Sequence, residues 1–203
     1  MEMKDFMTKL GSAAATPSGG GAAALNGATA TAMASMVAQL TVGKQKYAAY
    51  EANLKAIIHE MARLNRAFLT QINADAKGFA PLAKAYSIPK TDPNREAILN
   101  AALLKATEVP FEILKLANDL LPVLEQLLVQ GSRLLQSDVG VAATTLRSTL
   151  EAAVLNIYVN TQLLTDQDQA AALNQQAEAL VAPAVVRCQA VYQQVLTQLQ
   201  AQQ

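Results

Sequence analysis

The stretch "ATPSGGGAAALNGATATAMASMVAQLTVGKQKY", residues 15–47, decides how this chain folds. No charged residue occurs between Lys9 and Lys44, and most side chains in that interval are small. Such a segment is a membrane span, a flexible linker, or a loop that leads into a buried helix. It is long enough to cross a bilayer. However, its small polar residues make transfer into lipid unfavourable, and the Pro-Ser-Gly-Gly-Gly block would interrupt a span.

The pattern therefore favours a helix from about Gly21 to Val42 that is buried on nearly every side. A helix that is apolar or small all round belongs inside a protein. Small side chains also let neighbouring backbones approach closely. We expect this helix at the centre of a helical bundle or across the seam of a dimer.

The composition of the whole chain indicates an all-α protein. Hydrophobic residues make up 52% of the sequence but aromatic residues only 4%, so alanine and leucine supply most of the apolar side chains. These are strong helix formers, whereas β-branched runs bounded by turns are scarce. With 203 residues, we expect one domain over residues 1–203, folded as an antiparallel multi-helix bundle with short loops.

Charge and cysteine content exclude several classes of function. Sixteen basic and sixteen acidic residues give no net charge, so nothing favours nucleic-acid binding, and no basic run favours an anionic membrane surface. The single Cys188 excludes an internal disulfide framework and a CxxC metal cluster. In its alanine- and valine-rich surroundings it reads as a small buried hydrophobe. The N-terminal "MEMKDFMTKL" lacks a secretion signal, so we expect a cytoplasmic protein.

Apolar spacing and helix-breaking residues predict six to eight helices. Thr91 and Asp92 are candidate caps, with Pro93 in a first helical position. Pro110 is expected to start or kink a further helix. The expected ranges are 4–11, 21–42, 48–86, 93–108, 110–130, 138–164 and a last helix that ends near residue 200, kinked at Pro183.

Asp75 interrupts an apolar stripe. Residues 68, 72, 75, 79 and 82 recur at three- and four-residue steps, and all but Asp75 are apolar. A carboxylate on a buried face is unfavourable unless it is paired or acts on a ligand. Asp75 is therefore either a core aspartate bonded to a helix end or an arginine, or a functional group, and the pattern favours neither.

Four other polar residues are weaker candidates for a functional site. Asp138 precedes "VGVAATTL" and reads as an N-cap, which is compatible with a role in a site. Asn156 and Asn160 lie one turn apart on an otherwise apolar helix, so they indicate either a polar pocket or a hydrogen-bond clasp between helices. His59, the only histidine, has no second histidine at metal-binding spacing and reads as a solvent-facing or capping residue.

The glycines at residues 19–21 leave backbone N–H groups open at a helix N-terminus. By itself this is a weak signal, because the phosphate-loop pattern and the strand of a dinucleotide fingerprint are both missing. Lys44 and Lys46 at the far end of the same helix can simply offset its dipole.

Several strings in the chain together resemble the cyclodeaminase domain family, which includes the C-terminal half of formiminotransferase-cyclodeaminase and stand-alone bacterial methenyltetrahydrofolate cyclohydrolases. The resemblance covers about residues 4–168. It is carried, in order, by "TPSGGGAAALNGATATAMASMVAQLTVGKQKY", "DAKGFAPLAKAYSIPK", "REAILNAALLKATEVPF", "GSRLLQSDVGVAATTL" and "LNIYVN". The chain departs from the family pattern at Ala22 (often serine), Asn100 (glutamine) and Ser132 (often asparagine).

The resemblance implies a helical homodimer with tetrahydrofolate derivatives as substrates. It also implies that no metal and no permanently bound cofactor take part. In the cyclodeaminase reaction, N10 of 5-formiminotetrahydrofolate attacks the formimino carbon and ammonia leaves. In the cyclohydrolase reaction, water attacks the resulting 5,10-methenyl cation. A carboxylate can stabilise that cation and shuttle a proton.

On this basis each candidate residue receives an expected role. Asp75 is the acid/base or cation-stabilising group, and Asp138 is the second candidate for catalysis or pterin recognition. The expected substrate-binding residues are Ser18, Gly19, Gly20, Gly21, Lys44, Lys46, Asn156 and Asn160, with the two lysines meeting the glutamate tail.

Two other classes of protein remain open from the sequence. One is a non-catalytic folate- or partner-binding helical dimer that has lost turnover through changes such as Ala22 and Ser132. The other is a structural dimerisation module, against which Asp75 on the apolar stripe argues. Because the helical domain accounts for all 203 residues, we expect no formiminotransferase half, and the two folate reactions are not ranked.

Overall fold

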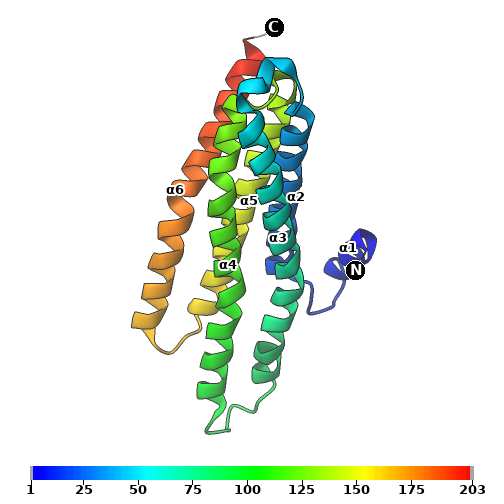
Figure 1. Cartoon of the computed structure of the whole chain (residues 1–203). Helices are drawn as coiled ribbons and strands as arrows, with labels where there is room; N and C mark the ends of the chain where they lie inside the picture. The colour runs from blue at the N-terminus through cyan, green and yellow to red at the C-terminus, as the bar shows by residue number, and fades with distance from the viewer. Residues whose placement is uncertain (1, 202–203) are drawn as a thin grey trace.

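The structure is a computed structural model, and it describes residues 2–201. The elements in this range are α1 (Met3–Leu10), α2 (Gly19–Thr41), η1 (Gln45–Tyr50), α3 (Glu51–Tyr86), α4 (Arg95–Gln130), η2 (Arg133–Leu135), α5 (Gln136–Thr161) and α6 (Gln167–Gln200). The η elements are short 3₁₀ helices, and residues 2–201 contain no strand. The prediction of an all-α protein is confirmed. Helices α2 to α6 lie side by side as a long bundle, and the short α1 lies to one side of it (Figure 1) with Phe6 buried near the start of α2.

Small residues bring α2 close to its neighbours. Ala23, Ala30 and Ala34 are at most 1% exposed. A Cβ atom on Gly27 would lie 2.5 Å from Cδ1 of Phe68 on α3, so only glycine fits there. The helix ends at Thr41, and Gly43 follows with a φ of +80°, the left-handed conformation typical of glycine after a helix.

The prediction that α2 is buried on nearly every side is wrong for one stripe. Thr29, Ala32, Met36 and Leu40 recur at three- and four-residue steps and are exposed. Charge and hydropathy do not reveal this stripe, because its residues are as uncharged as the buried ones. In this single chain the outer side of α2 therefore faces solvent.

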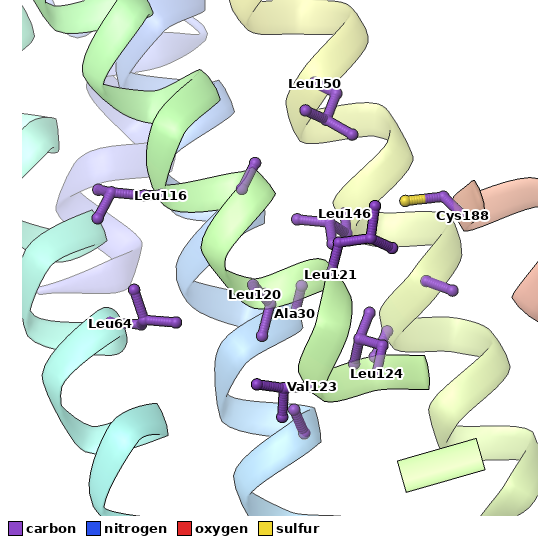
Figure 2. Close-up of a cluster of buried hydrophobic side chains, with 14 of the residues drawn as sticks. Ala30, Leu64, Leu116, Leu120, Leu121, Val123, Leu124, Leu146, Leu150 and Cys188 are labelled. Carbon is purple, nitrogen blue, oxygen red and sulfur yellow. The ribbon is translucent and has the colours of Figure 1, made fainter. Parts of the chain in front are cut away.

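Leucines from α3, α4 and α5 form the centre of the bundle (Figure 2). Leu64, Leu120 and Leu146 are fully buried, and Cys188 of α6, which lies near Leu146, is 1% exposed. The interpretation of Cys188 as a small buried hydrophobe is confirmed. Burial raises the pKa of its thiol to about 12, which keeps the sulfur protonated and unreactive near neutral pH.

Helix α4 differs from the prediction of two helices separated near Pro110. One helix runs from Arg95 to Gln130 through Pro110 and Pro122. Each proline removes one helical hydrogen bond, but buried leucines on both sides of Pro110 keep the helix packed and continuous. The predicted start at Pro93 is also wrong, because Asp92 instead accepts a hydrogen bond from the N–H of Asn94 in the preceding turn.

Helices α3 and α4 extend well beyond the start of α2 (Figure 1). The first turn of α2 contacts Asp75, and α3 continues from there to Tyr86. A second, smaller apolar cluster holds this end together. Because α2 begins only part of the way along α3, its N-terminus faces a space between α3, α4 and α5.

The last two helices agree closely with the sequence. α5 ends at Thr161 and α6 ends at Gln200. The Asp166 side chain caps α6 by accepting a hydrogen bond from the N–H of Gln169 at 2.9 Å. None of the helices within residues 2–201 is both long and apolar enough to span a membrane.

Candidate functional site

Asp75 lies half-buried on α3, beside the first turn of α2. Its Oδ2 atom accepts hydrogen bonds from the Ser18 hydroxyl and from the Gly21 N–H, each at 2.9 Å. The positive end of the α2 dipole therefore stabilises this carboxylate, and both bonds fix its orientation. Within residues 2–201 its Oδ1 atom accepts no hydrogen bond and packs against Gly20.

Gly20 is required by the close approach of Asp75. A Cβ atom on Gly20 would lie 2.6 Å from Cγ of Asp75, well inside van der Waals contact. Gly21 differs, because the nearest atom to its Cβ would be Cβ of Pro17 at 3.4 Å. Gly19 faces the Asn156 side chain, whose two terminal amide atoms would both lie 3.2 Å from a Cβ atom at position 19. Gly20 thus lets a carboxylate approach the helix terminus, and Gly19 lets an amide approach it.

A cavity of about 150 Å³ lies next to Asp75. Ser18, Asn156 and Asn160 also line it, so the cavity brings together four of the ten residues expected at the site. A cavity of this size holds a benzene-sized ring. The space beside the carboxylate therefore accommodates one ring of a ligand, and the rest of a larger ligand must extend outward.

Asn156 and Asn160 line the cavity instead of forming a clasp between helices. The Asn156 amide donates to the Ala152 carbonyl at 2.8 Å, and the Asn160 amide donates to the Asn156 carbonyl at 2.9 Å. Both donors are thus satisfied within α5. Neither side chain bonds to another helix in the described range, which leaves the two amide oxygens as acceptors beside the cavity.

The cavity is also lined by residues that had no expected role. Gly78 and Phe79 come from α3, and Ala106, Val109 and Pro110 come from α4. The sequence offered one signal, because the resemblance includes the "ATEVPF" segment. Pro110 has no N–H to donate to the Ala106 carbonyl four residues earlier, so a backbone oxygen in this wall lacks its usual helical partner.

Lys44, Lys46 and Asp138 do not reach this cavity within one chain. The Lys44 ammonium donates to the Ser132 hydroxyl at 3.2 Å, at the junction between the end of α2 and the start of α5. Asp138 lies in the first turn of α5, so its prediction as an N-cap is wrong. Helix α5 begins two residues earlier than expected because η2 leads directly into it.

The end of the bundle near Lys44 has its own cavity, of about 380 Å³, lined partly by Lys46, Tyr47, Arg133 and Gln136. The Arg133 N–H donates to the Tyr47 hydroxyl oxygen at 2.9 Å, and this hydrogen bond lowers the pKa of Tyr47. Gln136 is 5% exposed, and its Oε1 atom is buried without a hydrogen-bond partner.

The remaining residues that the sequence singled out have structural positions. Asn100 bonds to Thr165 through both amide atoms and so ties α4 to the loop before α6. Ala22 lies in the second turn of α2 and does not line the Asp75 cavity. His59 is exposed, which confirms its interpretation as solvent-facing. No three His, Cys, Asp or Glu side chains in the described range group together as metal ligands.

Comparisons with known proteins agree with this arrangement. Residues 2–179 match the family model described as formiminotransferase-cyclodeaminase. The chain is 36% identical over 197 residues to the methenyltetrahydrofolate cyclohydrolase of Methylorubrum extorquens, covering 95% of each chain. It is 30% identical over 205 residues to the formimidoyltransferase-cyclodeaminase of Sus scrofa, covering 99% of this chain and 37% of the length of the pig protein.

The fold has a counterpart among solved structures. The crystal structure of formiminotetrahydrofolate cyclodeaminase from Thermotoga maritima superposes with a TM-score of 0.84 at 24% identity, covering 99% of this chain and 96% of that one. This likeness supports the helical architecture. Together with the family match over residues 2–179, it shows that the chain belongs to the formiminotransferase-cyclodeaminase family.

Proposed function

We propose that this member of a family of folate one-carbon enzymes is a methenyltetrahydrofolate cyclohydrolase, working in the cytoplasm as a homodimer. The observation that carries the proposal is the Asp75 carboxylate, held at a helix N-terminus beside a ring-sized cavity. The full-length similarity to the cyclohydrolase of Methylorubrum extorquens supports this choice of reaction.

The chemistry suits the arrangement of groups. Water adds to the carbon between N5 and N10 of the 5,10-methenyl cation, and Asp75 accepts the proton that the water loses. The carbon–N5 bond of the tetrahedral adduct then breaks while N5 gains a proton and the hydroxyl loses one. The products are 10-formyltetrahydrofolate and one net proton. A carboxylate stabilises the cation and carries these protons without a metal or a redox cofactor.

Other residues have supporting roles in this proposal. The Ser18 hydroxyl and the Gly21 N–H hold Asp75 in place. The Asn156 and Asn160 oxygens accept hydrogen bonds from the pterin, and Phe79 offers an apolar wall for its ring. The Ala106 carbonyl supplies a further acceptor.

The second candidate is formiminotetrahydrofolate cyclodeaminase, favoured by the 30% identity to the pig cyclodeaminase across 99% of this chain. The same carboxylate would accept a proton from N10 as it attacks the formimino carbon, and the departing nitrogen would leave as ammonia. A third possibility is a folate-binding dimer without turnover. Calorimetric titration with tetrahydrofolate derivatives separates it from the enzymes, because it would show binding with no product.

The test follows the methenyl chromophore in both reactions. For the hydrolase, wild-type protein is expected to remove the chromophore, and Asp75→Asn is expected to lower kcat by about 10² to 10⁴-fold, the usual contribution of general acid–base catalysis. Asp168→Asn is the matched control, because Asp168 is exposed in the first turn of α6. An Asp75→Asn enzyme as fast as the control would remove Asp75 from the mechanism.

A further inference from the structure

Ser18 occupies the position before α2 in which a serine normally caps a helix. An N-cap serine usually accepts a hydrogen bond from an N–H two or three residues further along the helix. Here the Ser18 side chain makes no capping bond, and its hydroxyl donates to Oδ2 of Asp75 at 2.9 Å. The Gly21 N–H donates to the same oxygen, also at 2.9 Å. A carboxylate of α3 therefore caps α2 in place of the local serine.

The observed arrangement competes with a local one. If the Ser18 hydroxyl turned towards the helix, it could accept the Gly21 N–H itself, and Asp75 would lose both of its donors. Bonds between a serine side chain and the nearby backbone form readily, because they need no residue from another helix. The hydroxyl therefore stays on Asp75 only while the chain before Ser18 is held in place.

Hydrogen bonds do not hold that segment. Those of Gly11, Ser12 and Ala14 stay within α1 and the turn that follows it. Within residues 2–201, no hydrogen bond joins residues 11–17 to the bundle. The position of Ser18 therefore depends on how α1 packs.

Phe6 is the side chain through which α1 packs. It is 4% exposed and is the only buried residue of α1. Together with Leu25 of α2 and with Leu69 and Ile72 of α3, it lines a cavity of about 220 Å³. An isolated helix shorter than about 12 residues is at best marginally stable in water, and α1 has eight. Docking of Phe6 against α2 and α3 therefore holds α1 in place.

The Phe6 ring also reaches the groups that hold Asp75. A Cβ atom on Gly21 would lie 3.4 Å from Cβ of Pro17 and 3.8 Å from Cε2 of Phe6. Oδ2 of Asp75 would be 3.7 Å from the same point. The ring, the proline before Ser18 and the carboxylate thus meet on one side of Gly21. Phe6 does not line the Asp75 cavity, so its influence on the carboxylate passes through this packing and not through the substrate.

We propose that Phe6 is a positioning residue for Asp75. By docking α1 against the start of α2, it keeps the Ser18 hydroxyl on the carboxylate and away from the Gly21 N–H. The inference rests on the proposed function and adds a residue, outside the substrate cavity, that sets the rate of the reaction. Without this anchor the serine caps α2 itself, and the carboxylate turns away from the reacting carbon.

Phe6→Ala tests the anchor. The variant is expected to lower kcat by about tenfold to a hundredfold, because a catalytic group that is misplaced by about 1 Å loses rate on that scale. KM is expected to stay unchanged, because Phe6 does not line the cavity. Circular dichroism should show the bundle intact, since Phe6 belongs to neither of the two apolar clusters of the bundle. Phe6→Leu is expected to regain most of the lost rate.

Met7→Ala is the matched control, because Met7 is the next residue of α1 and is 50% exposed. It removes an apolar side chain from the same helix and leaves the anchor in place, so its kcat should match that of wild type. A Phe6→Ala enzyme as fast as Met7→Ala would overturn the proposal, and so would a loss that appears in KM alone.

A double-mutant cycle shows whether Phe6 acts through Ser18. If it does, Ser18→Ala already removes the contact that Phe6 protects, and the further substitution Phe6→Ala should then lower kcat by less than about twofold. Equal losses from Phe6→Ala with and without the Ser18 hydroxyl would mean that Phe6 acts by another route, which refutes the proposal.

Urea unfolding tests the same contact without turnover. The effects of Ser18→Ala and Asp75→Ala on the unfolding free energy are expected to be non-additive in the wild-type background, because the two side chains are bonded. In the Phe6→Ala background they are expected to be additive. Coupling that survives Phe6→Ala, or that is absent from wild type, contradicts the proposal. If wild type turns over neither folate, the proposed function fails, and the unfolding cycle still decides the role of Phe6.

Discussion

The substitution Gly20→Ala tests whether the glycine run exists to position Asp75. The added Cβ would lie 2.6 Å from Cγ of Asp75, whereas carbon atoms pack at about 3.5–4.0 Å. The carboxylate must therefore move by about 1 Å, away from the Ser18 hydroxyl and the Gly21 N–H. A misplacement of that size lowers the rate of a positioned catalytic group by about 10²-fold.

The effect on stability is expected to be small by comparison. Overpacking costs about 1–3 kcal/mol, but alanine is favoured over glycine within a helix by about 1 kcal/mol. The net loss of unfolding free energy is then about 0–2 kcal/mol, while kcat falls by about 10²-fold. Urea unfolding followed by circular dichroism measures the first quantity, and decay of the methenyl chromophore measures the second.

Gly21→Ala provides the matched control one residue away. Its new Cβ would lie no closer than 3.4 Å to another atom, and its N–H still bonds to Asp75. We expect kcat within about threefold of wild type for this variant, because no transition-state contact is displaced. Equal kcat values for the Gly20→Ala and Gly21→Ala enzymes would refute the reasoning about the close approach.

Three further predictions concern stability and reactivity. Gly27→Ala places a Cβ 2.5 Å from Cδ1 of Phe68 and is expected to lower the unfolding free energy in urea by about 1–3 kcal/mol. Burial raises the pKa of Cys188 from 9.0 to about 12. The stability that its protonated thiol contributes is therefore full below pH 9 and is lost as the pH rises towards 12. At pH 8, iodoacetamide should label this thiol only when urea unfolds the protein, and rapid labelling of the native protein would contradict its burial. The Arg187 guanidinium lowers the pKa of Glu125 below 4.5, so the pair stabilises the fold above pH 4.5 and loses this effect as pH falls through the folded pKa. Because both groups are partly exposed, Glu125→Gln should cost less than about 1 kcal/mol of unfolding free energy at pH 7, and this cost should shrink as the pH falls below 4.5.

The parts of the fold that depend on local chemistry could be predicted from the sequence. The small-residue helix was expected within two residues of its observed bounds, because the Pro-Ser-Gly block and Gly43 mark its ends. The prediction that a separate helix begins at Pro110 was wrong for a physical reason. The loss of one hydrogen bond is local, whereas the burial of leucines on both sides of the proline is a tertiary effect.

The candidate site, too, could be predicted only where it depends on local sequence patterns. The three- and four-residue spacing placed Asp75 on the side of α3 that faces the bundle, but a period cannot show that the partner of a carboxylate is the N-terminus of another helix. The separation of Gly20 from Thr41 is different, since both lie on the uninterrupted helix α2, whose rise per residue fixes it. The exposed stripe of α2 could not be predicted, because uncharged exposed residues look the same in the sequence as uncharged buried ones.

Pro110 limits how amino-acid substitutions can change the wall of the Asp75 cavity. The Ala106 carbonyl beside it belongs to the main chain, so side-chain substitutions at position 106 leave that oxygen in place. Only replacement of the proline itself restores an N–H to occupy it. This backbone acceptor is thereby shielded from most single side-chain substitutions, and a homologue without the proline would have one free backbone acceptor fewer.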